Sequence, residues 1–131
     1  MIQRIQTVWL LFVLGLAVAT FMILPVVNTI DNIWSRLNWL LCFHAAIFSL
    51  IAIFRYKNRK RQLHWCYVVV GLLCAEYIQM GLSLWFVHQS FAMEYLRFTA
   101  VFPFIALVFD SMAIRAIKKD DKLVRSLDRL R

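Results

Sequence analysis

Residues 65–87 read WCYVVVGLLCAEYIQMGLSLWFV, and Glu76 is the only charged side chain among these 23 residues. An α-helix needs about 20 mostly apolar residues to cross the hydrocarbon core of a bilayer. This stretch is therefore long and apolar enough to span a membrane. Three further apolar runs cover residues 5–24, 38–54 and 95–114, of which the second is near the short limit. The sequence thus predicts an all-α integral membrane protein with four spans.

The composition leaves little room for anything else. The chain has 131 residues, of which 63% are hydrophobic, and a mean hydropathy of +0.71. Four spans with short connections predict one up-down four-helix bundle over residues 1–119, followed by a tail at 120–131. The net charge of +8 would suit nucleic-acid binding, but the basic residues lie in short segments beside apolar runs. No nucleic-acid partner is therefore expected.

The distribution of basic residues predicts the orientation in the membrane. Thirteen of the 15 Lys and Arg residues lie before the first run, between the second and third runs, or after the fourth. The opposite side of the membrane holds only Arg36 and Arg97. Because cytoplasmic loops carry the excess of Lys and Arg, both termini are expected in the cytoplasm.

The chain lacks recognisable catalytic motifs. It contains no Gly-rich phosphate loop, no HExxH and no paired-cysteine motif. Cys42, Cys66 and Cys74 lie within the spans, lack metal-ligand spacing and are expected to be small apolar fillers. We therefore expect neither an enzyme nor a cofactor or metal.

Two spans carry stripes of small and weakly polar residues at helical spacing. Such stripes usually form the faces on which membrane helices pack together. The members are Asn38, Cys42, Ala45 and Ser49 in the second span and Thr99, Pro103, Ala106 and Asp110 in the fourth.

Ionisable side chains inside the spans are the strongest candidates for function, since they are costly in lipid. His44 and Glu76 each lie about 15 Å from the inner ends of their spans by helix rise. We expect them to face each other and to share a proton or hydrogen bond. Gln79 and Ser83 continue the Glu76 face, and Asp110 is expected to pair with Arg115 or reach water. Both a proton-coupled or ligand site and a purely structural interhelical network fit this pattern.

The tail after Ile114 is too charged to be buried. An aspartate at 120 or 121 would cap a short separate helix with an apolar face opposite a basic one. Two kinds of contact fit such a helix, namely anionic lipid headgroups and a partner protein. The residues expected to make these contacts are Leu123, Val124, Arg125, Leu127, Arg129, Leu130 and Arg131.

The two ends of the chain, Met1 to Val8 and Ala113 to Arg131, resemble a family of small bacterial four-helix inner-membrane proteins known only as a domain of unknown function. The resemblance implies a bacterial inner-membrane protein and brings no known activity. The charged tail is the most recognisable block, which favours partner contact over generic lipid binding.

Two functions remain open from the sequence. The first is a non-enzymatic accessory or scaffolding subunit of a larger membrane complex, contacting membrane lipids and other membrane proteins. The second is a small proton-coupled transporter that works as a homodimer with Glu76 as its central carboxylate. A lipid- or quinone-binding protein that uses His44 and Glu76 ranks last.

Overall fold

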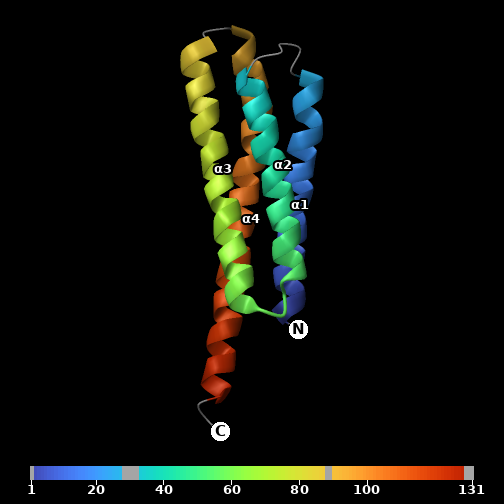
Figure 1. Cartoon of the computed structure of the whole chain (residues 1–131), viewed down its shortest axis with the longest axis vertical. Coiled ribbons are helices and arrows are strands. Elements are labelled where there is room, and N and C mark those ends of the chain that lie inside the picture. The colour runs from blue at the N-terminus through green and yellow to red at the C-terminus, as the bar shows by residue number, and fades with distance from the viewer. Residues whose placement is uncertain (1, 28–32, 88–89, 129–131) are drawn as a thin grey trace.

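The computed structural model consists of four α-helices (Figure 1). It describes the backbone of residues 2–27, 33–87 and 90–128, and within them the side chains of residues 5–23, 33, 36–82, 85 and 100–126. The helices are α1 (Ile2–Val27), α2 (Ile33–Phe54), α3 (Arg59–Val87) and α4 (Ser90–Asp128). Each contains a segment long and apolar enough to cross a membrane. The prediction of an all-α chain with four potential spans is confirmed.

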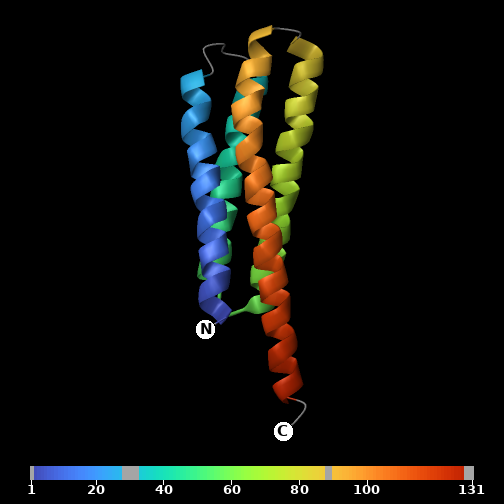
Figure 2. The same cartoon turned by 180° about the vertical axis from the view of Figure 1, so that it is seen from behind.

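The helices form a ring. Successive helices run in opposite directions, and α1 closes the ring by packing on α4 (Figures 1 and 2). Within the described residues, no Cα atoms of the diagonal pairs, α1 with α3 or α2 with α4, lie within 8 Å of each other. The start of α1, the α2–α3 connection and the last turns of α4 lie at the same end of the bundle. This end carries residues 55–61 and 115–125 and is hereafter the basic end.

Small and weakly polar residues line the interior, as their spacing predicts. In α2 the whole stripe of Asn38, Cys42, Ala45 and Ser49 is buried. In α4 Pro103, Ala106 and Asp110 are buried, whereas the side chain of Thr99 lies outside the described residues. Small side chains allow helix backbones to approach closely, which is how membrane helices commonly associate.

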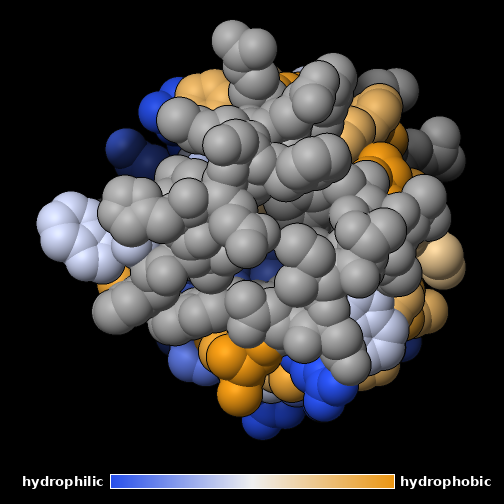
Figure 3. All heavy atoms as spheres, turned by 90° about the horizontal axis from the view of Figure 1, so that it is seen from above, coloured by the Kyte–Doolittle hydropathy of each residue, from blue (hydrophilic) through white to orange (hydrophobic). Residues whose placement is uncertain are grey.

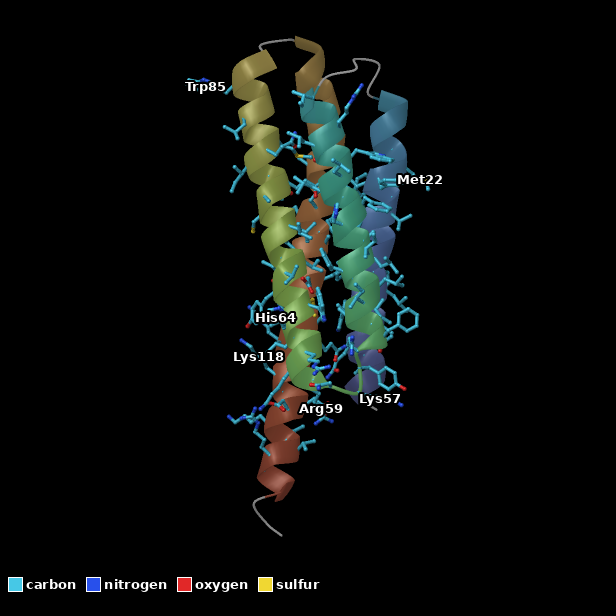
Figure 4. All side chains as sticks on the ribbon, viewed as in Figure 1. Met22, Lys57, Arg59, His64, Trp85 and Lys118 are labelled. Carbon is cyan, nitrogen blue, oxygen red and sulfur yellow. The ribbon has the colours of Figure 1, made fainter. Side chains whose placement is uncertain are left out.

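Many large apolar side chains point outward from the bundle. Met22 and Trp85 extend away from α1 and α3 in Figure 4, and they are 61% and 78% exposed. Viewed from above, apolar side chains emerge at several places around the rim (Figure 3). Such a surface is unfavourable in water but matches lipid tails. The outer surface and the four long helices together fit a multi-pass membrane protein.

The α2–α3 connection is tight because Asn58 caps α3. Its side-chain Oδ1 accepts a hydrogen bond from the backbone N–H of Arg61 at 3.3 Å, and its carbonyl accepts one from Gln62 at 2.9 Å. Asparagine is among the preferred residues at this position. As a result α3 begins at Arg59, one and a half turns before the apolar run at Trp65.

The C-terminal helix differs from the prediction. The expectation of a separate short helix after Ile114 is wrong, because α4 runs unbroken for 39 residues. No Gly or Pro follows Pro103, so nothing in the sequence interrupts the helix. Asp120 pairs with Arg59 of α3 at 2.8 Å instead of capping a new helix. The end of α4 therefore projects beyond the other three helices as a continuous helix (Figures 1 and 2).

Candidate functional site

Glu76 lies in the interior of the bundle with 1% of its surface exposed. Its Oε1 accepts a hydrogen bond from the thiol of Cys42, on α2, at 2.8 Å. Asn38, one turn from Cys42, is also buried, and its Oδ1 has no hydrogen-bond partner among the described residues. Gln79, one turn further along α3, is 9% exposed. These four residues form a buried polar group between α2 and α3, which we name the Glu76 cluster.

His44 does not belong to this cluster. The expected His44–Glu76 pair is wrong, because His44 is exposed on the outer face of α2. Its Nδ1 lies 2.7 Å from the carbonyl oxygen of Leu40, and its ring borders Phe43 and Phe48. The reason is helical geometry, since residues two apart in a helix point about 200° apart. Once Cys42 faces the interior, His44 must face outward, whatever its depth in the membrane.

Asp110 of α4 is a second buried acidic side chain in the described interior. It is 0% exposed, and neither carboxyl oxygen has a hydrogen-bond partner among the described residues. The thiol of Cys66 on α3 lies close enough to act on this carboxyl group, but not in hydrogen-bonding geometry. The expected pair with Arg115 is wrong, because Arg115 is exposed on another side of α4. Residues five apart in a helix, such as Asp110 and Arg115, point about 140° apart.

The two buried carboxyl groups share a pattern that sequence reasoning missed. Each lies beside a cysteine of a neighbouring helix, Cys42 for Glu76 and Cys66 for Asp110. The cysteines were expected to be inert fillers, although Cys42 and Asn38 already shared a polar stripe that signals the first of these contacts. A thiol is a weak hydrogen-bond donor that leaves a carboxyl group without charge compensation.

The two carboxyl groups lie at different depths along the bundle axis. Cys66 and Glu76 both belong to α3 and lie ten residues apart, which is about 15 Å along the helix. Among the described residues no group of three or more His, Cys, Asp or Glu side chains is placed to hold a metal ion. Each carboxyl group is a separate position that can hold or release one proton. The predicted continuation of this face at Ser83 lies outside the described side chains.

The projecting end of α4 presents two different faces. Leu123 is 43% exposed and Val124 is half-buried, whereas Arg125 is exposed and pairs with Asp121 at 2.7 Å. The other predicted contact residues, Leu127, Arg129, Leu130 and Arg131, have side chains outside the described residues. Helical spacing separates Leu123 from Arg125 by about 200°. The apolar and basic residues of the tail therefore lie on opposite faces of the helix.

Comparison with known proteins identifies a family whose function is unknown. Residues 30–130 match the family model described as domain of unknown function DUF4293. No curated protein and no solved structure matches the chain. Because the match covers most of the chain, including the charged tail, this protein belongs to the DUF4293 family.

Proposed function

We propose that this DUF4293 protein is a non-enzymatic protein of the bacterial inner membrane and an accessory or scaffolding subunit of a larger membrane complex. Both termini would lie in the cytoplasm, because the basic end carries most of the Lys and Arg residues. The observation that carries the proposal is the projecting end of α4, which reaches beyond the bundle as a continuous helix.

The apolar face of this helix end lacks a cover among the described residues. Higher in α4, Ala113 and Ile117 are buried against the other helices. Leu123 follows about one and a half turns later and is 43% exposed. An exposed apolar helix face rimmed by charge is a common site of helix–protein contact.

The continuity of α4 favours a protein over a membrane surface as the occupant of this face. A helix that lies on lipid headgroups must turn away from the membrane-spanning helix that precedes it. Here α4 has no break between Ile114 and Asp128, so its end points away from the membrane when the bundle spans it. Leu123 is then directed toward the cytoplasm, where a partner protein can reach it.

Aromatic side chains on the outside of the bundle supply a second type of contact. Trp39 and Phe43 of α2 are 39% and 43% exposed, and both pack on Phe21 of α1. Trp39 stacks on Phe21 with their ring centroids 4.6 Å apart. Aromatic residues are enriched in protein interfaces, so this patch suits packing against a helix of the same complex.

Replacing Leu123 by Glu is expected to reduce the membrane proteins that co-purify with the chain by about tenfold or more. The substitution places a charge in the apolar face that we assign to the partner, and a loss of about 1.4 kcal/mol at a central contact residue is enough for a tenfold change. The measurement is purification in mild detergent at native expression level, followed by quantitative mass spectrometry.

The matched control is Arg125→Gln, which makes the same change of one charge unit at an exposed position on the opposite face of the same helix end. We expect it to retain the partners. If a chain without residues 120–131 kept every partner, the tail would have no part in assembly. If the wild-type chain purified as a homodimer without other proteins, the subunit proposal would be abandoned in favour of the second candidate.

The second candidate is a small homodimeric proton-coupled transporter that uses Glu76. The observation in its favour is that Glu76 and Asp110 are both buried and contact thiols, with no cationic partner among the described residues. Carboxyl groups in such positions within membrane proteins often mark proton relays. The placement of Glu76 near the middle of α3 is the property that a central proton carrier needs.

For this candidate, Glu76→Gln is expected to reduce pH-gradient-driven proton flux in proteoliposomes to the background of empty vesicles. An amide keeps the shape of the carboxyl group but cannot exchange the proton. The control is Asp121→Asn, which neutralises a carboxylate at the basic end and should leave the flux unchanged. Equal flux in the wild-type protein and Glu76→Gln would eliminate the transporter.

A further inference from the structure

A groove lies at the basic end, between the first turns of α3 and the last turns of α4. Its volume is about 280 Å³. Figure 4 shows Arg59 and Lys118, which come from its two sides, close to each other at the lower end of the bundle. The groove is lined by Arg59, Lys60 and Leu63 of α3 and by Ile117, Lys118, Asp121, Lys122 and Arg125 of α4.

The lining is strongly cationic. Five of the eight residues are basic, and Asp121 is the only acid. Asp121 is compensated by Arg125 at 2.7 Å, and Arg59 is held by Asp120 at 2.8 Å. Among the described residues, Lys60 and Lys122 are exposed and make no ion pair. The groove therefore carries an excess of positive charge that an anion would neutralise.

Part of this charge is held in place before any ligand binds. The Arg59 guanidinium is fixed by its ion pair with Asp120, which is itself buried. The Lys118 ammonium lies 5.4 Å from the centre of the Tyr67 ring, which positions it on the α3 side. Groups that are already ordered lose less entropy on binding, so a phosphate bridging the two helices would be held efficiently.

The apolar part of the lining distinguishes a lipid from a free ion. Leu63 and Ile117 lie in the groove beside the basic residues, within three residues of the limits of the apolar runs at Trp65 and Ile114. Lipid phosphates and glycerol backbones occupy this depth of a membrane. A free phosphate would use the charges alone and gain nothing from the two apolar side chains.

We infer that this groove binds the phosphate of an anionic membrane lipid, with the headgroup between Lys60 and Lys122 and the glycerol region against Leu63 and Ile117. Basic pockets between membrane helices are suited to such headgroups. This site is separate from the partner contact proposed at Leu123. Lys118, Lys122 and Arg125 repeat at i, i+4 and i+7 and so share one face of α4, which Leu123 does not.

The test uses the full-length protein in detergent and short-chain phosphatidylglycerol, with phosphatidylcholine of equal chain length as the uncharged comparison. Bound lipid is counted by native mass spectrometry during titration. We expect phosphatidylglycerol to bind in preference to phosphatidylcholine. The variant Lys60→Gln/Lys122→Gln should weaken phosphatidylglycerol binding on the order of 30-fold, since it removes two basic side chains at the headgroup.

The matched control is Lys57→Gln/Lys119→Gln, which removes the same charge from exposed lysines of the basic end outside the groove. We expect less than about a threefold change for it. Equal weakening of lipid binding in the two double variants would show that the effect comes from the overall charge of the basic end, and it would overturn the proposed site. In a separate arm, displacement of the lipid by inorganic phosphate at matching concentration would overturn the lipid as the ligand. Both sets of substitutions change exposed side chains, so the variants should fold.

Discussion

Replacing Asp110 by Val is expected to make the protein more stable, by about 1–3 kcal/mol. Both carboxyl oxygens of Asp110 are buried and lack a hydrogen-bond partner among the described residues. A buried polar group without a partner costs about this amount, because the unfolded chain hydrates it and the folded chain does not. Valine fills a similar volume with apolar atoms. The measurement is the thermal unfolding temperature in detergent, followed by tryptophan fluorescence.

The conservative variant Asp110→Asn provides the control. Its amide keeps a polar group in the same apolar surroundings, so it should give none of this gain. A lower unfolding temperature for Asp110→Val than for the wild-type protein would contradict the prediction. It would show that the carboxyl group has a stabilising partner in the folded protein.

A stabilising Asp110→Val substitution would have a consequence for function. Residues that reduce stability are typical of functional sites, where activity needs a group that packing alone would not select. A variant that gains stability and loses proton flux would add Asp110 to Glu76 in the transporter. A variant that gains stability and keeps all partners and activity would leave Asp110 without a role in either candidate function.

Replacing Ala52 by Phe is expected to destroy the bundle or destabilise it by about 3 kcal/mol or more. Ala52 of α2 is 0% exposed and belongs to a buried cluster that joins all four helices, with Leu10, Cys66 and Ala113 among its members. A phenyl ring at this position must force the helices apart, and overpacking of this size is at the upper end of measured costs. The measurement combines size-exclusion chromatography with thermal unfolding.

The control for overpacking is Leu50→Phe, two residues away on the same helix. Leu50 is 42% exposed on the outer surface, so a larger apolar side chain there meets lipid or detergent. We expect its effect to stay within about 0.5 kcal/mol. If both variants behaved alike, the assignment of inner and outer faces of α2 would be wrong.

The sequence by itself determined the class of the protein and much of its interior. Length and hydropathy define four potential spans, because the thickness of a bilayer imposes a minimum run of apolar residues. Helical periodicity also identified the buried stripe of α2 from Asn38 to Ser49, since small residues on one face favour close packing. These features depend only on spacing along one helix, which a sequence states directly.

Contacts between helices were decided by the tertiary structure alone. Depth along the spans placed His44 and Glu76 at one level, yet depth carries no information about rotation, and His44 faces outward while Cys42 contacts Glu76. Rotation about each helix axis is fixed only when all four helices pack together. The same packing brings Asp120 to Arg59, across 61 residues of sequence, and so forms the basic groove between α3 and α4.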